Sequence, residues 1–401
     1  MEVDDALRMM RDPLGAPFYP QVFQVLLVIT WVIHIFFVTL AVGASVSTIW
    51  GFRRGGEYEL RLARSTARLT PSAVGLGIVT GIAPLLFLQT IYDPIWYASN
   101  ALTGFWSVIF ILVVASGYTC AYVFYLKGSP EGRLLWTSVA GLVLLLLAGW
   151  IMHVLASVSI RPEQWRQWYA PDGVADTRGI QFHAANAGRV TFLLPLQGAL
   201  SVAIAGLVYT WYRSKRADAD REFLTWVAAR ARRVGIVASL LYSAAGVWWG
   251  LTEGAEMKVG IEVTVTLGAL GLALAAFFAL HRNPVAIGPR AIAAWFGSLA
   301  VVAVVREVIR SSALAEFGYR MADYPFRVDW GSVAMFGVTS VVGVSIIVYL
   351  VLVLYQAGLR SADQATISLR VDRFGRVATG MLGAWFGFFL LVGLYAVLVL
   401  K

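Results

Sequence analysis

The sequence predicts an all-α integral membrane protein, a polytopic bundle of about ten transmembrane helices with both termini on the outer, periplasmic side. Three observations lead to this fold class. Hydrophobic residues make up 59% of the 401 residues and charged residues only 14%, whereas about 25% are charged in soluble domains. The apolar residues gather into long runs, and basic residues gather in alternate connections between those runs. A soluble enzyme, a nucleic-acid-binding domain and a disordered chain are thereby excluded.

Ten apolar runs are each long enough to form a transmembrane helix, which needs about 20 mainly apolar residues. The third run carries no charged residue between Leu102 and Leu126, and the sixth run is the shortest. We therefore expect ten spans in order along the chain, at approximately 21–50, 71–92, 102–126, 134–160, 181–212, 234–251, 262–281, 288–306, 329–358 and 377–400.

The connections between the spans alternate in charge. Basic residues outnumber acidic ones in each odd-numbered connection, for instance Arg53 to Arg68 after the first span and Arg213 to Arg233 after the fifth. Lysine and arginine stay on the cytoplasmic side of a membrane, so both termini are expected outside. The net charge of +9 therefore reflects basic residues that gather on the cytoplasmic side of a lipid membrane, and it does not indicate that the chain binds nucleic acid. We expect a multi-pass protein of a bacterial inner (cytoplasmic) membrane.

The chain is expected to form a single membrane domain, 1–401, because no linker rich in proline, glycine or serine interrupts it. Residues 1–20 begin with acids and lack the basic start of a signal peptide, so they are interpreted as a short interfacial segment. The single cysteine, Cys120, permits no disulfide within the chain, and the sequence contains no CxxCH motif. The chain therefore attaches no c-type haem of its own.

The four histidines, His34, His153, His183 and His281, are the first candidates for chemistry. An ionisable residue inside a membrane is costly and is by default a functional candidate. Imidazole is also the usual axial ligand of b-type haem, so His34, His153 and His183 are candidate ligands. The alternative for each is a hydrogen bond between helices. His281 ends the seventh span beside an arginine, and we expect it to be interfacial with no ligand role.

Four further residues are candidates for holding a cofactor. Met257 opens the seventh span, and methionine with histidine forms a low-spin axial pair, although most methionines only fill gaps in a core. Glu307 ends the eighth span with Arg310 three residues on, and an i,i+3 surface ion pair is the alternative there. Arg189 lies in the membrane below His183, where its charge is costly unless it pairs with an anion such as a haem propionate.

Five motifs in order resemble subunit I of the cytochrome bd quinol oxidase superfamily, of which this chain would be a divergent member. The resemblance runs through the first nine spans, 21–358, and leaves 377–400 as an extra helix. The motifs are His34-Ile-Phe-Phe-Val-Thr-Leu-Ala-Val-Gly43 in the first span, Gly77-Ile-Val-Thr-Gly-Ile82 in the second, Gly149-Trp-Ile-Met-His153 in the fourth, Gln181-Phe-His183 opening the fifth, and Arg306-Glu-Val-Ile-Arg310 ending the eighth.

The resemblance implies that the chain binds about one to three b haems through ligands carried over by position. His34 matches a ligand of the family's high-spin haem pair, and Glu307 matches the glutamate ligand at the end of the eighth helix. His183 matches one ligand of the low-spin b haem, and Met257 is the candidate for the methionine of that haem. His153 stands where a hydrogen-bond partner is expected.

The chain departs from the family in two places. The family's third helix carries glutamates for proton delivery, whereas 102–126 contains no acid, and the family's long quinol-binding loop shrinks to about 251–261. We therefore expect a b-haem electron-transfer subunit of a quinol-oxidising respiratory complex. It would move electrons between quinol and haems near the outer face, with other subunits as partners and a c-type cytochrome as acceptor. Two alternatives stay open: a genuine quinol:oxygen terminal oxidase subunit, and a haem-free transporter or membrane scaffold.

Overall fold

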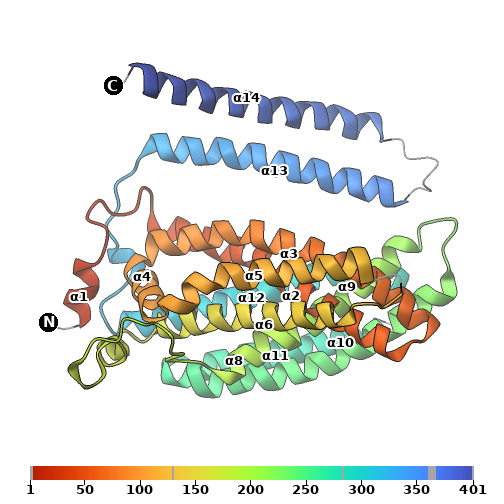
Figure 1. Ribbon diagram of the computed structural model, residues 1–401, viewed down its shortest axis with the longest axis horizontal. Helices are drawn as coiled ribbons and strands as arrows, with labels where there is room; N and C mark the ends of the chain where they lie inside the picture. Colours follow the sequence, from red (N-terminus) through yellow and green to blue (C-terminus); the bar gives the residue numbers. More distant parts are fainter. Residues whose placement is uncertain (1–2, 129–130, 282–283, 360–366, 400–401) are drawn as a thin grey trace. The chain divides into compact units, whose positions relative to one another are not determined.

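The computed structural model describes residues 3–128, 131–281, 284–359 and 367–399, and within them the chain is almost entirely α-helical (Figure 1). Ten helical segments in the described part are long and apolar enough to cross a membrane. The predicted all-α fold with about ten spans is thus confirmed. The side on which each terminus lies stays a prediction. Of the predicted end segments, Met1, Glu2 and Leu400 lie outside the described residues.

The first half of the chain forms four long helices and several short ones. The predicted interfacial segment contains the short helix α1 (Val3–Met9). The long helices are α2 (Pro20–Arg54), α3 (Glu57–Ile91), α5 (Gly104–Val123) and α6 (Leu135–Val158), and α4 (Asp93–Leu102) joins α3 to α5. The π-helical turn η1 (Phe124–Gly128) closes α5, and the short turns η2 (Pro162–Gln164), α7 (Trp165–Tyr169) and η3 (Pro171–Gly173) follow α6.

The second half contains the remaining spans, two of which include π-helical turns. The fifth span is built from α8 (Ala187–Thr191), the π-helical η4 (Phe192–Leu196) and α9 (Gln197–Arg213). The sixth span joins α10 (Arg221–Trp249) to the π-helical η5 (Gly250–Gly254). The last helical elements are α11 (Gly260–Leu280), α12 (Pro284–Ala315), the turn η6 (Met321–Asp323), α13 (Trp330–Leu359) and α14 (Leu369–Val399).

The chain divides into two compact units. The first unit comprises Met1–Trp211 and Asp220–Phe326, and its long helices run side by side in Figure 1. The second unit comprises Tyr212–Ala219 and Arg327–Lys401 and includes α13 and α14. Within the second unit, Trp385 of α14 donates a hydrogen bond from Nε1 to Oγ1 of Thr339 on α13 over 2.9 Å. Every candidate site residue predicted from the sequence lies in the first unit.

The main core of the first unit lies between α9, α10, α11 and α12 and one face of α2. Its large side chains include Trp249, Trp295 and Phe278, each at most 1% exposed. Helices α2 and α9 approach closely where Gly43 faces Gly198, because a Cβ atom on Gly43 would overlap the carbonyl oxygen of Gly198. Small residues permit such close helix packing. Helix α2 also packs against α12, and these two helices carry Gln24, His34, Arg306, Glu307 and Arg310.

Three spans begin well before the positions that the sequence predicts. The second span starts at Glu57 and the sixth at Arg221, well before the predicted positions 71 and 234. The tenth likewise begins at Leu369 instead of 377. The prediction stopped at charged residues, but a helical backbone continues past the apolar stretch when its arginines find partners. Arg232, for example, donates from Nε to the carbonyl oxygen of Phe278 over 2.8 Å.

The predicted start of the fifth span, which placed His183 at a helix N-terminus, was wrong. The helix starts at Ala187, and residues 174–186 are non-helical, so His183 lies in an irregular segment. The cause is Asn186, whose side-chain oxygen accepts a hydrogen bond from the backbone N–H of Arg189 over 2.8 Å. Asparagine is a preferred N-cap because it satisfies such an otherwise unpaired N–H.

The predicted end of the eighth span was also wrong. Helix α12 continues to Ala315, so Glu307 lies two turns inside the helix and not at its end. Its carboxylate forms the i,i+3 ion pair with Arg310, as the alternative reading proposed, but both side chains are nearly buried, with 11% and 10% exposure. The charges that ended the predicted span are therefore paired inside the protein.

Candidate functional site

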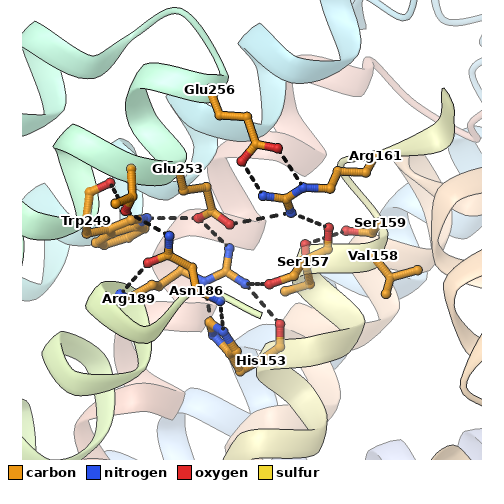
Figure 2. A network of polar contacts seen from close by, with 12 residues as sticks. His153, Ser157, Val158, Ser159, Arg161, Asn186, Arg189, Trp249, Glu253 and Glu256 are labelled. Carbon is orange, nitrogen blue, oxygen red and sulfur yellow. Dashed lines mark hydrogen bonds and ion pairs between the residues drawn. The ribbon is translucent and has the colours of Figure 1, made fainter. Parts of the chain in front are cut away.

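Two clusters of charged side chains are buried among the helices of the first unit. Figure 2 shows the first, which we call the arginine network and which joins α6, the connection after it, the start of α8, and the end of the sixth span. Its members are His153, Ser157, Arg161, Asn186, Arg189, Glu253 and Glu256. The second, which we call the Glu307 cluster, joins α2, the start of α4 and α12 through Gln24, Tyr92, Glu307 and Arg310.

Arg189 lies at the centre of the arginine network and is 6% exposed. Its Nη1 donates to Oε2 of Glu253 over 2.7 Å. Its Nη2 donates to the hydroxyl of Ser157 over 2.5 Å and to the backbone carbonyl oxygen of His153 over 2.9 Å. A buried charge is tolerated when it is paired and hydrogen-bonded. We predicted that the charge of Arg189 would pair with an anion. In this structure that anion is the carboxylate of Glu253.

Arg161 extends the network to a second carboxylate. Its guanidinium donates to both oxygens of Glu256, over 3.0 and 2.6 Å, and Nη1 lies 3.7 Å from Oε1 of Glu253. Burial acts to lower the pKa of Arg161, but the carboxylates of Glu256 and Glu253 outweigh it and raise that pKa. Two arginines thus face two glutamates, and the charges of the network balance.

His153 is held by donors on both sides of its ring. Nε2 lies 2.9 Å from the backbone N–H of Asn186, and Nδ1 lies 3.1 Å from the Nε–H of Arg189. A neutral imidazole offers one acceptor nitrogen, so only one of these approaches is a full hydrogen bond. Neither nitrogen is left open toward a metal ion. This placement agrees with the hydrogen-bonding role that the sequence resemblance implied for His153.

Glu253 is the most deeply buried acid of this network, and the sequence did not single it out. It is fully buried, and Oε2 also accepts a hydrogen bond from the indole Nε1 of Trp249 over 2.8 Å. The sequence placed it in a short connection, 251–261, whereas the structure places it in η5, which continues α10. Its signal was an acid directly after an apolar run that includes Trp248 and Trp249. An acid in such a position is costly without a function or a partner.

The Glu307 cluster holds its carboxylate with three donors. Oε1 accepts a hydrogen bond from Nε2 of Gln24 over 2.9 Å and another from the hydroxyl of Tyr92. Oε2 accepts from Nη1 of Arg310 over 2.5 Å. The Arg310 guanidinium also lies 4.9 Å from the centre of the Tyr92 ring. The sequence did not identify Gln24 or Tyr92, since neither residue type stands out in an apolar run.

Arg306 differs from the other buried arginines. Its guanidinium lies 4.0 Å from the centre of the Trp31 ring, and within the described part of the chain no carboxylate forms an ion pair with it. The neighbouring acid, Glu307, is already engaged by Arg310. Since the arginine network and the Glu307 cluster are each balanced, Arg306 is a positive charge in the first unit that lacks an anion.

His34 on α2 turns its ring toward α3. Nδ1 lies 2.9 Å from the carbonyl oxygen of Gly77, which fixes the tautomer with the proton on Nδ1. Gly81 makes room for the ring, because a Cβ atom there would come within 2.8 Å of Cε1 of His34. In the described part of the chain Nε2 has no hydrogen-bond partner. The second-span motif, 77–82, therefore positions the ring of His34 through the carbonyl oxygen of Gly77 and the space beside Gly81.

His183 and Met257 are not brought together. The ring of His183 stacks on Trp168, with ring centres 5.3 Å apart, and burial lowers its pKa. Met257 is 7% exposed in the main core, and its backbone carbonyl oxygen accepts a hydrogen bond from Ser312 over 2.7 Å. No contact in the described residues joins the two side chains. The low-spin axial pair that the sequence resemblance implied therefore stays a prediction.

Haem, the cofactor implied by the sequence resemblance, fits one part of this site and not another. Haem iron takes only one or two side-chain ligands. In the described residues no group of three histidine, cysteine or carboxylate side chains converges as it would around a bare metal ion. His34 fits an iron ligand because Nε2 is open, and Arg306 fits a propionate because it lacks an anion. His183 stacks on Trp168 and Met257 packs in the main core, so neither contact supports a shared iron.

Comparisons with known proteins agree with the motifs at the level of the fold. No family model and no curated protein matches this sequence. Among solved structures, a chain of the bd oxidase from Geobacillus thermodenitrificans matches with a TM-score of 0.56 and 12% sequence identity, over 92% of this chain and 99% of that chain. The chain thus has the fold of a bd oxidase chain, with a sequence that is only 12% identical to it.

Proposed function

We propose that the chain is a haem-b-binding membrane subunit that moves electrons from quinol within a respiratory complex of a bacterial inner membrane, with both termini outside. The bd oxidase fold supports a place in respiration, and the polar contacts of the first unit support haem as the cofactor. Haem b, once bound, supplies one-electron chemistry. The partner that receives the electrons is a c-type cytochrome on another subunit, near the outer face.

The observation that carries this proposal is the state of His34. Metal-ligating histidines donate one ring N–H to a carbonyl or carboxylate, which fixes the tautomer and leaves the other nitrogen free to ligate. His34 has this arrangement, with Nδ1 on the carbonyl oxygen of Gly77 and Nε2 open. A helix-to-helix hydrogen bond alone also explains the Gly77 contact, but it does not explain a buried arginine that forms no ion pair with any described carboxylate.

Arg306 is that arginine. The positive charge of Arg306 acts on His34, and no described carboxylate forms an ion pair with Arg306. A haem propionate would neutralise the Arg306 charge. The carboxylate of Glu307 accepts hydrogen bonds from Gln24, Tyr92 and Arg310, which leaves one lone-pair position on its Oε2. The roles of these residues are to bind and orient: His34 on the iron, Arg306 on a propionate, and Glu307 as a fixed charge beside them.

The acceptor we favour is not oxygen, because α5 carries no charged residue. Reduction of oxygen to water consumes protons at the haem, and a helix without carboxylates does not relay them alone. Outward transfer to a cytochrome requires no such relay. The bd oxidase fold favours the rival function, a quinol:oxygen oxidase subunit, so the two acceptors have to be compared directly.

The ligand assignment is tested by replacing His34 and a matched control, His281. Both rings bond a backbone carbonyl through Nδ1 over 2.9 Å, but His281 ends its span at α11. We expect His34→Ala to lose most of the b-type α band in the reduced-minus-oxidised spectrum of the purified protein, and His281→Ala to keep it. The reverse pattern would overturn the assignment.

The acceptor is tested by feeding quinol to the purified complex. The proposal expects quinol to reduce a c-type cytochrome while oxygen consumption stays at the background rate. Rapid quinol-dependent oxygen consumption would instead identify a terminal oxidase. A chain without any haem band would leave the third alternative, a transporter or membrane scaffold.

A further inference from the structure

A cavity of about 250 Å³ lies in the first unit, directly beside the Glu307 cluster. Two buried tyrosines, Tyr92 and Tyr319, line it with 1% and 2% exposure, and Arg320 is exposed. The wall also includes Gln24 and Ser311. We call it the Tyr92–Tyr319 cavity. It is separate from His34, which faces Gly77 on α3.

The size and walls of the cavity suit one flat aromatic ring. Its volume is slightly below the range of about 300–1,000 Å³ that holds drug-sized ligands, so a porphyrin does not fit. The rings of Tyr92 and Tyr319 are nearly parallel, with centres 6.1 Å apart and an interplanar angle of 22°. Aromatic rings prefer such neighbours for stacking or edge contacts.

The polar groups of the wall offer an acceptor, because the phenol protons of Tyr92 and Tyr319 are already donated to Glu307 and to the carbonyl oxygen of Ile91. The amide Nε2 of Gln24 donates to Glu307 and, over 3.2 Å, to the hydroxyl of Tyr92. The amide oxygen of Gln24 accepts no hydrogen bond from any described residue. Burial raises the pKa of Tyr92 and of Tyr319, so both phenols stay protonated. A ligand hydroxyl would therefore find an open acceptor at Gln24.

The cavity lies where a membrane-soluble ligand has access. Gln24 is in the first turns of α2, a membrane span, and its neighbours Val22 and Val25 are 40% and 58% exposed. Arg320, which is exposed, and Met321 also line the cavity, from the segment that follows α12. A ligand with a hydroxylated ring and an apolar tail suits this place. Its ring would lie in the cavity and its tail along the exposed side chains of Val22 and Val25.

We propose that the Tyr92–Tyr319 cavity binds the head group of a quinol or quinone, with Gln24 as the residue that recognises a ring oxygen. This proposal rests on the proposed function, which requires a quinol, and it names the place where that quinol binds. Glu307 lies one hydrogen bond behind both Gln24 and Tyr92, so the ring is held beside a fixed negative charge.

The test measures binding of decylubiquinone and of menadione to the full chain in nanodiscs of quinone-free lipid. Gln24→Leu removes the acceptor, and Ala315→Phe fills the cavity from α12. The matched control is Thr30→Val on the same helix, whose hydroxyl bonds its own helix at Leu26 over 2.7 Å. We expect both cavity variants to raise the Kd at least tenfold and the control to leave it unchanged.

A second readout does not depend on how the variants fold. In a Cys120→Ser background, Met321→Cys is expected to react with maleimide and to be protected by either quinone, since Met321 lines the cavity. Equal binding by all variants, or no protection of Met321→Cys, would overturn the quinone site while leaving the haem spectrum as it is. Loss of binding in both cavity variants of a haem-free chain would keep the site and overturn the proposed function.

Discussion

Glu253 is the residue on which the arginine network depends. It is fully buried and is the only described carboxylate within 4 Å of Arg189, while it also approaches Arg161. Removing one partner of a buried ion pair is far more harmful than the net contribution of the pair suggests, because the remaining charge has neither water nor a counterion. The network is therefore held together by one carboxylate.

We expect Glu253→Gln to lower the free energy of unfolding by about 3–5 kcal/mol, because Arg189 would stay buried without an anion. Denaturant unfolding of the purified protein in detergent measures this loss. The double variant Glu253→Gln, Arg189→Gln should lose less than the two single variants together, since their side chains form one network.

Glu256→Gln is the control for that loss. Glu256 also binds an arginine of the network, but 48% of its side chain is exposed. Ion pairs with exposed partners contribute about 0–1 kcal/mol, so a loss below about 1 kcal/mol is expected. Equal losses for Glu253→Gln and Glu256→Gln would show that burial does not set the energetics of this network.

The sequence reveals single conspicuous residues of the site better than it reveals their partners. Arg189 and Glu307 stand out because charges are rare in apolar runs, and the structure buries both. The partner of Arg189, Glu253, lies 64 positions away and resembled a connection residue. The sequence placed His183 on a helix because an apolar pattern does not show where a helix begins. Here the helix begins only after the N-cap residue Asn186.

At the scale of the elements, the α2–α9 crossing sets the distance between two parts of the first unit. Gly43 and Gly198 face each other there, and neither leaves room for a side chain. Because Gln24, Trp31 and His34 are all on α2, a shift of that helix moves the residues of the candidate site together.

We expect Gly43→Ala to destabilise the protein by about 1–3 kcal/mol, because the added methyl group overlaps the backbone of α9. Gly297→Ala on α12 is the matched control, since a Cβ atom there meets nothing within 4 Å. It should be neutral or stabilising by up to about 1 kcal/mol, as alanine favours a helix over glycine. Thermal unfolding of both variants measures the difference, and similar effects would argue against the close crossing.

The number and order of the spans are predictable because hydropathy depends only on local composition. The residues at which the spans begin and end are harder to predict, as helices α10 and α12 show. Helix α10 begins at Arg221, among charged residues that the apolar pattern assigns to a connection. Helix α12 passes through Arg306, Glu307 and Arg310 to Ala315. Where a helix ends depends on whether its charges find partners, and those partners come from elsewhere in the fold.

At the scale of the whole molecule, composition and charge together describe a protein embedded in lipid. The second unit is the clearest case, because only 6% of the apolar window of α13 and 0% of that of α14 is buried. In the first unit, two buried clusters of charges are balanced, and among the described residues no carboxylate forms an ion pair with Arg306. The apolar faces of α13 and α14 therefore require lipid, and the guanidinium of Arg306 requires an anion that the described residues do not supply.

The predicted orientation is testable by cysteine labelling in a Cys120→Ser background. Val174→Cys places an exposed thiol after α6, where the outer face is predicted, and Ala217→Cys places one in the arginine-rich connection after α9. In intact spheroplasts we expect a membrane-impermeant maleimide to label Val174→Cys only, with Ala217→Cys reacting after lysis. The opposite pattern would invert the topology and place both termini inside.

The central claim is that this chain binds haem b. The most direct measurement is the reduced-minus-oxidised visible spectrum of the purified wild-type protein, together with extraction and identification of its haem. We expect a b-type α band and at least one extractable haem b per chain. A protein that folds and inserts into the membrane but shows no haem band and releases no haem on extraction would contradict the account.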